Sequence, residues 1–146
     1  MTLFADSLPM VLNRALDAVL PPYREIFARF NLTEQQWRIL RVLWERKTIS
    51  SIELARTCLI PPPSLVGVLD RLEARDLVAR FRSQEDRRLV LVEVTEDGRA
   101  IANEVMPMVD EIHHNLRARV TPEEWGMLQS ILQKFENDRM AFDRAG

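Results

Sequence analysis

The segment IPPPSLVGVLDRLEARDLVARFRSQEDRRLVLVEV, from Ile60 to Val94, determines how this chain folds. Its three prolines predict a helix start, because proline is tolerated in the first turn of a helix, where its missing N–H would be unpaired anyway. The apolar residues that follow recur at helical spacing and form one stripe: Leu65, Val68, Leu69 and Leu72. The opposite side carries small residues. We expect such a helix to press its first turns, with their unpaired N–H groups, against a phosphate-bearing surface.

Two short segments after this helix predict a β-hairpin. Residues 77–82 and 89–94 are rich in β-forming residues, whereas residues 83–88 between them are too polar to be buried. From Val78 to Val92 there are four arginines against two acidic residues, a local net charge of +2 in a chain whose net charge is −2. A helix followed by a hairpin with a basic tip is the layout of a winged helix. One element then enters the major groove of DNA, and the tip reaches the minor groove or the backbone.

Several strings carry a family resemblance. LEARDLVAR at 72–80, DRR at 86–88 and VTEDG at 94–98 resemble the signature of the multiple-antibiotic-resistance (MarR) family of bacterial transcription regulators. The resemblance extends over essentially the whole chain, since NLTEQQWRIL at 31–40 also fits. It is strongest to the branch that represses homoprotocatechuate (4-hydroxyphenylacetate) degradation operons, and it implies a homodimeric winged-helix protein. Asp76 replaces a glycine that is common in the family, and aspartate tolerates left-handed backbone, so we expect the turn to survive.

Composition is consistent with one ordinary domain. The chain has 146 residues, with 47% hydrophobic and 29% charged residues, which is enough to bury a core. The single cysteine, Cys58, excludes an internal disulfide and indicates a reducing compartment. There is no cationic N-terminal region followed by an apolar stretch, and no run reaches the ~18 apolar residues needed to span a bilayer. We therefore expect a cytoplasmic protein with no membrane partner.

The remaining segments predict a helical frame around this winged helix. Residues 4–30 predict one helix, kinked or split at Pro21 and Pro22. Capping boxes predict helices from 33 to about 46 and from 50 to about 57, with a very short strand between them. Two further helices are predicted after Thr95 and Thr121. The expected fold class is mainly α (α+β): a single MarR-type domain over 1–146, with a winged helix-turn-helix DNA-binding lobe at 33–94 and dimerisation helices at 1–30 and 95–146.

The candidate DNA contacts lie on the proline-led helix and on the hairpin tip. With so few long polar groups, thymine-methyl contact and DNA shape should matter more than bidentate hydrogen bonds. The residues expected to face base edges are Pro62, Ser64, Leu65, Val66 and Gly67. Arg71 is expected to hold a phosphate. The family resemblance implies that Arg88, oriented by Asp86, enters the minor groove, and the expected backbone contacts are Arg80, Arg82 and Arg87. The alternatives are a plain core helix and a solvated turn.

An effector site is implied by the resemblance alone. Members of the family bind small aromatic acids between the dimer helices and the DNA-binding lobe, so an arginine near aromatic residues is the natural carboxylate anchor. The candidates are Arg14, Tyr23, Trp37 and Arg38. The alternative for each of them is ordinary packing or an ordinary surface position.

Catalysis and metal binding have little support. The chain offers no nucleophile set of serine, cysteine and histidine, and its four glycines form no phosphate loop. His113 and His114 are adjacent and point about 100° apart on a helix, while Asp110 with His114 is a weak pair by itself. We therefore expect neither an enzyme nor a cofactor. Two other functions stay open: an effector-independent DNA-binding regulator and a winged-helix protein-interaction module. Salt-sensitive binding to a DNA duplex is expected of a regulator and not of the interaction module.

Overall fold

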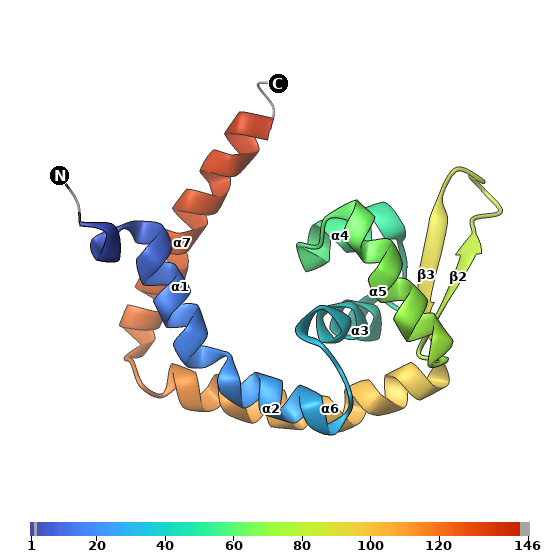
Figure 1. Cartoon of the computed structure of the whole chain (residues 1–146), viewed down its shortest axis with the longest axis horizontal. Helices are drawn as coiled ribbons and strands as arrows, with labels where there is room; N and C mark the ends of the chain where they lie inside the picture. Colours follow the sequence, from blue (N-terminus) through green and yellow to red (C-terminus); the bar gives the residue numbers. More distant parts are fainter. Residues whose placement is uncertain (2, 144–146) are drawn as a thin grey trace. The chain divides into compact units, whose positions relative to one another are not determined.

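The computed structural model describes Met1 and residues 3–143 of the chain and, beyond residue 137, the backbone only. The described part is mainly helical with one small sheet (Figure 1). In chain order its elements are η1 (Phe4–Asp6), α1 (Leu8–Val19), α2 (Pro21–Arg29), α3 (Glu34–Arg46), β1 (Thr48–Ser50), α4 (Ser51–Cys58), α5 (Pro62–Ala74), β2 (Val78–Arg82), β3 (Val90–Val94), α6 (Glu96–Arg117) and α7 (Pro122–Asp143). The predicted order of helices and strands is confirmed, and the first predicted helix is split at the prolines.

The helix starts follow from local side-chain chemistry. Thr33 forms the predicted capping box, because its hydroxyl accepts from the Gln36 N–H at 3.1 Å and its own N–H donates to Gln36 Oε1 at 3.0 Å. Ser50 caps α4 by accepting from the Glu53 N–H at 3.3 Å. These caps fix where α3 and α4 begin, and therefore how β1 is placed between them.

The three strands form one antiparallel sheet in the order β1-β3-β2. Val92 of β3 lies opposite Ile49 of β1 on one side and Arg80 of β2 on the other. The third strand, expected at residues 47–49, is thus confirmed and lies one residue later, at Thr48–Ser50. Figure 1 shows the β2–β3 hairpin beside α5, with α3 and α4 nearby. This is the winged-helix arrangement that the sequence predicts.

The core of the winged helix is formed by α3, α4, α5, β3 and the first half of α6. The fully buried side chains of these elements include Ile39, Leu40, Leu43, Leu54, Leu69, Leu72, Val92 and Val105. We call the β2–β3 hairpin the wing. At the turn that leads from α5 into the wing, Asp76 has φ 55°, so the expected left-handed turn is confirmed, with aspartate in place of glycine. Gly98, in the first turn of α6, lies so close to the preceding turn that a Cβ would be 2.1 Å from the Leu77 carbonyl oxygen. The backbone of α6 at Gly98 therefore packs directly against the backbone of Leu77, at the start of the wing.

The chain separates into two compact units, with the boundary between Val109 and Asp110 inside α6. In the second unit, Thr121 forms a capping box with Glu124, and the Trp125 ring lies edge-on to His113 at 5.4 Å. Within the described residues no single helix has the length and apolar composition that crossing a membrane requires. Only α4 and α5 taken together, bent by 102°, meet that test.

Candidate nucleic-acid interface

The first turn of α5 has no backbone donor to offer a phosphate. Pro61, Pro62 and Pro63 lack N–H groups. The next two N–H groups, of Ser64 and Leu65, both donate to the Pro61 carbonyl oxygen at 2.9 and 3.0 Å. The expectation that the N–H groups at this helix start bind phosphate is therefore wrong, because the prolines that begin the helix also remove its free donors.

Most of the residues expected to face base edges lie on the accessible side of α5. Pro62, Ser64 and Val66 are exposed, and Gly67 is partly exposed. Leu65 is only 3% exposed and belongs to the core. The expectation that Leu65 faces base edges is therefore wrong: it lies on the apolar stripe of the helix, about 100° around the axis from its neighbours. Arg71, the expected phosphate contact, is exposed one turn further along.

Arg80 of β2 is held by two carboxylates of α5. Its Nε donates to Glu73 Oε2 at 2.7 Å and its Nη2 to Asp70 Oδ1 at 2.5 Å, and the side chain is 25% exposed. The hydrogen bonds that Arg80 donates to Glu73 and Asp70 raise the pKa of Arg80 above its usual value. We call these three residues the Arg80 cluster. Two nitrogens of Arg80 are therefore occupied by carboxylates of α5, and the residue joins the wing to α5. The phosphate contact expected of Arg80 stays a prediction.

The tip of the wing is organised around Asp86. Its carboxylate accepts from the Arg88 backbone N–H at 3.1 Å, from Arg88 Nε at 3.0 Å and from Arg88 Nη2 at 3.1 Å. The hydrogen bonds from the Arg88 side chain, and then from its backbone, lower the pKa of Asp86. Arg88 nevertheless remains 90% exposed. The arrangement therefore holds a guanidinium group in water in a fixed orientation.

Three more hydrogen bonds shape this tip. The Ser83 hydroxyl accepts from the Asp86 N–H at 3.3 Å, and the Ser83 N–H donates to the Leu89 carbonyl at 3.0 Å. Arg82 Nη1 donates to the Arg87 carbonyl at 2.9 Å, and both arginines are exposed. Sequence reasoning missed Ser83, which is buried, so the expectation that residues 83–88 are too polar to be buried is wrong for this residue. Its position three residues before Asp86, where a serine hydroxyl commonly accepts from a turn N–H, is the signal that could have found it.

The predicted effector residues fall into two groups. Tyr23 and Trp37 lie on either side of Phe27, with ring centroids 6.4 and 5.6 Å from it, and burial raises the pKa of Tyr23. We call these three residues the aromatic row. Arg14 Nη1 instead donates to the Ala5 carbonyl at 2.6 Å, and Arg38 Nη1 donates to the Cys58 carbonyl at 3.2 Å. The structure thus brings the aromatic candidates together and engages the two arginines elsewhere.

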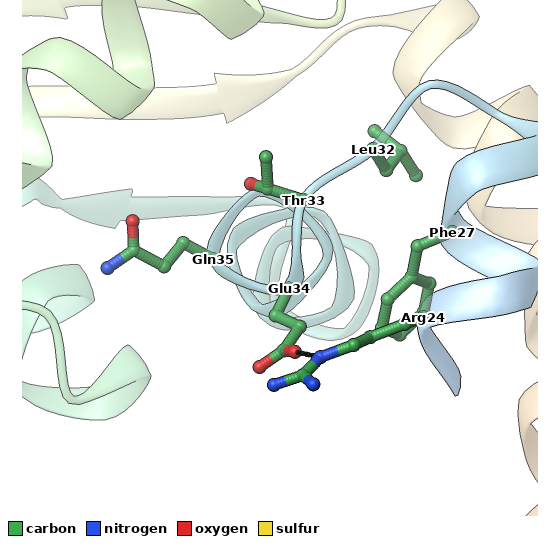
Figure 2. Close-up of a pocket in the computed structure, with 6 residues that line it drawn as sticks. All are labelled: Arg24, Phe27, Leu32, Thr33, Glu34 and Gln35. Carbon is green, nitrogen blue, oxygen red and sulfur yellow. Dashed lines mark hydrogen bonds and ion pairs between the residues drawn. The ribbon is translucent and has the colours of Figure 1, made fainter. Parts of the chain in front are cut away.

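A cavity of about 360 Å³ opens beside the aromatic row, between α2 and the start of α3. Figure 2 shows Phe27 and Leu32 on its apolar side, and Arg24 ion-paired with Glu34 across it. Its volume is within the range of small-molecule sites. Arg24 pairs with Glu34 through Nε, so the two terminal nitrogens of its guanidinium remain as donors for an acid.

Arg41 is a further candidate that sequence reasoning missed. It follows Trp37 by one helical turn on α3, and its guanidinium lies 5.3 Å from the centroid of the Trp44 ring. Arg41 Nη1 is buried and makes no hydrogen bond of good geometry. Glu45 Oε1 is 2.8 Å away, so the pair is an ion pair by distance but is poorly aligned. The spacing of three between Arg41 and Trp44 was the available signal for this cation beside an aromatic ring.

Cys58 has the properties of a core residue. It is buried at the end of α4, and burial raises its pKa to about 11, against a smaller opposite effect of Arg38. A thiol with this pKa is almost fully protonated at neutral pH and reacts slowly. Among the described residues, no three His, Cys, Asp or Glu side chains are grouped so that they could hold a metal ion.

Known proteins are similar to this chain in sequence and in fold. Residues 32–90 match the family model described as MarR family. The homoprotocatechuate degradative operon repressor of Escherichia coli is 36% identical to this chain over 130 residues, which cover 89% of this chain and 88% of the relative. This chain belongs to the MarR family. Proteins of the MarR family are transcription regulators and not enzymes, and the predicted winged-helix fold is confirmed.

Solved MarR-family structures agree over nearly the whole chain. NadR in complex with 4-hydroxyphenylacetate is 32% identical, with a TM-score of 0.79, and the match covers 92% of this chain and 96% of NadR. A mutant of Escherichia coli MarR in complex with operator DNA is 25% identical, with a TM-score of 0.81, covering 92% of this chain and 99% of that protein.

Proposed function

We propose that this MarR-family regulator is a repressor that binds a pseudo-palindromic operator as a homodimer, with its two α5 helices in successive major grooves about one helical turn apart. The observation that carries the proposal is the wing tip, where Arg88 is highly exposed and yet fixed by three hydrogen bonds to Asp86. A cation held in this way loses little conformational entropy on entering a narrow minor groove, where the negative potential is concentrated.

Uncovered apolar surface on the outer helices supports a dimer. α1 has no buried residue, and four of its apolar side chains stay exposed at helical spacing: Leu8, Val11, Leu12 and Leu16. In the second unit, α7 exposes Met127, Leu128, Ile131 and Phe135. Contiguous apolar patches of this kind are usually covered by a partner. We assign them to the dimer interface predicted for residues 1–30 and 95–146.

The effector in this proposal is a small aromatic acid such as 4-hydroxyphenylacetate or 3,4-dihydroxyphenylacetate. The complex of NadR with 4-hydroxyphenylacetate and the name of the Escherichia coli relative support this class. Within the aromatic row Phe27 and Trp37 are buried and Tyr23 is partly exposed, so an acid would meet the row mainly through Tyr23. The candidate carboxylate anchors are Arg41, whose Nη1 makes no hydrogen bond, and Arg14 and Arg38, which each use Nη1 on a backbone carbonyl. Binding of the acid favours a spacing of the two wings that no longer fits the operator. A coupling free energy of about 1–3 kcal/mol lowers operator affinity about 5- to 150-fold.

Fluorescence anisotropy with the chain's own upstream intergenic DNA tests the proposal. We expect tight binding that weakens with salt, and Arg88→Ala should lower the affinity and make the slope of log K against log salt less steep by about 1.8, which is 0.9 for each protomer. Arg46→Ala, at an exposed arginine outside α5, the wing and the segments assigned to the dimer interface, is the matched control. Sedimentation should show an unchanged dimer for both variants.

The same titration distinguishes the alternatives. Release of the duplex by one of the two acids supports the effector class, and salt-dependent binding that ignores both acids leaves a regulator without this effector. An Arg88→Ala variant that binds normally removes the wing from the mechanism. Absence of salt-sensitive binding to any duplex contradicts the proposed function and favours a protein-interaction module.

A further inference from the structure

The accessible face of α5 between residues 61 and 67 has almost no hydrogen-bonding capacity. Its three prolines carry no N–H, and the Ser64 and Leu65 N–H groups are both used by the Pro61 carbonyl. The Ser64 hydroxyl is the one polar side-chain group in this stretch. Bidentate readout of guanine or adenine needs arginine, lysine, asparagine or glutamine. These first two turns of α5 therefore cannot read a purine edge in the usual way.

Further along α5, the nearest acid is already engaged. Asp70 binds Arg80 through the Arg80 cluster, which lowers its availability as an acceptor for cytosine. Arg71 is exposed, and a long cation at the edge of a groove more often reaches a phosphate than a base. Apolar and steric contacts are what remains for base readout by the early turns of the helix.

Val66 and Gly67 supply such contacts. Val66 keeps 55% of its surface exposed, at a position where a polar residue would suit water better. At Gly67 a Cβ would meet nothing within 4 Å, and φ is not in the left-handed region, so the fold itself has no need of a glycine here. Glycine is disfavoured inside a helix relative to alanine. An outside surface that comes very close to the helix at Gly67 accounts for its presence.

We infer that α5 reads its operator through the C5-methyl groups of thymine, with Val66 as the specificity-determining residue and Gly67 as the point of closest approach to the bases. The thymine methyl is the apolar feature of the major groove, and it distinguishes T·A from every other pair at that position. This inference rests on the proposed function and specifies how the operator is recognised.

A comparison of thymine and uracil duplexes tests the inference. A duplex selected by the full-length protein from a randomised pool is synthesised with thymidine or with deoxyuridine, which removes the methyl groups and keeps base pairing. Wild-type protein should bind the thymine duplex about fourfold more tightly for each methyl in contact, as burial of one methyl-sized group predicts. Val66→Ala, at an exposed position, should fold normally and lose this preference.

Two variants provide controls. Arg88→Ala should weaken binding to both duplexes equally and keep the preference for thymine, because it acts at the wing. Gly67→Ala should keep or raise the Tm and weaken binding to both duplexes, because the added methyl group meets the DNA. A thymine preference that disappears in Val66→Ala and persists in Arg88→Ala supports the inference.

Three outcomes would overturn it. Equal binding of wild-type protein to the two duplexes excludes methyl readout while leaving the proposed function in place. A thymine preference that Val66→Ala retains in full removes Val66 as the reader. Failure to select or bind any duplex in a salt-dependent manner contradicts the proposed function, and the inference then falls with it.

Discussion

Variants of the Arg80 cluster can show whether Arg80 positions the wing or contacts DNA directly, because the two roles predict opposite changes in operator affinity. Arg80 joins β2 to Asp70 and Glu73 of α5 through hydrogen bonds of 2.5 and 2.7 Å. The side chains of these acids are 57% and 44% exposed, so each ion pair stabilises the fold by only about 0.2–1 kcal/mol. Arg80→Ala should therefore remain folded, with the free energy of unfolding lowered by about 1 kcal/mol.

The larger effect should be on operator binding. Without the Arg80 cluster, the wing must be ordered against α5 when DNA binds, and immobilising two wing arginines costs about 0.5–1.5 kcal/mol each. We expect Arg80→Ala to weaken operator binding about 5- to 150-fold for each protomer, as measured by fluorescence anisotropy. The slope of log K against log salt should not change, because no phosphate contact is lost. Arg87→Ala, at an exposed wing arginine, should change that slope by about 0.9 per protomer if it contacts a phosphate.

The double variant Asp70→Asn/Glu73→Gln gives the decisive comparison. It removes two negative charges per protomer from the DNA-facing lobe, so a purely electrostatic effect would strengthen operator binding. Positioning by the Arg80 cluster predicts weaker binding instead. If the double variant binds more tightly and Arg80→Ala flattens the salt dependence, Arg80 is a phosphate contact as the sequence predicted, and the positioning role is refuted.

Two further predictions concern stability and the thiol. Gly98→Ala should lower the free energy of unfolding by about 1–3 kcal/mol in urea denaturation, because its Cβ would overlap the Leu77 carbonyl, whereas Gly126→Ala, where a Cβ meets nothing, should raise it by about 0.5–1 kcal/mol. Because burial raises the pKa of Cys58 to about 11 in the folded state, the native thiol should react with iodoacetamide at pH 8 much more slowly than the urea-unfolded chain. The stability that the protonated Cys58 contributes is complete below about pH 9 and is lost as the pH rises through about 11. Cys58→Ala should remove that part of the pH dependence, and rapid native alkylation would contradict the burial.

Features that depend on three or four neighbouring residues were predictable from the sequence. The capping boxes at Thr33 and Thr121, the split at Pro21 and the proline start of α5 all act over one helical turn, and each is present. Asp76 at φ 55° belongs to the same class. Because these signals specify where elements begin, they also specified the order of elements and hence the winged helix.

The two wrong expectations about α5 arose because two interpretations of the same atoms were made independently of each other. The prolines that start α5 also remove its N–H donors, and the Pro61 carbonyl takes the next two. Leu65 was assigned both to the apolar stripe and to base edges, and helical geometry allows only one of these positions, as its burial shows. Both corrections could have been made from the sequence by counting the N–H groups left at the start of α5 and by assigning each residue to one face of the helix.

The partners of long arginine side chains could not be predicted in this way. Arg80 binds acids seven and ten residues earlier, Arg38 binds a carbonyl twenty residues later, and Arg14 turns back to η1. Each guanidinium reaches whichever acceptor the tertiary fold brings within several ångströms, and residue spacing does not encode that choice. The aromatic row is different, because rigid rings on α2 and α3 meet wherever those helices pack.

The number of arginines that are free to contact phosphates, rather than the total number of arginines, therefore limits electrostatic binding to DNA. Sequence alone offers five candidate arginines on α5 and the wing, and the Arg80 cluster withdraws one of them. The remaining candidates are Arg71, Arg82, Arg87 and Arg88, all exposed. Eight such groups in a dimer, each neutralising one phosphate, limit their contribution to the slope of log K against log salt to about −7. A steeper measured slope would mean either that DNA breaks the Arg80 cluster or that arginines elsewhere in the chain reach the duplex, and Arg80→Ala separates these cases.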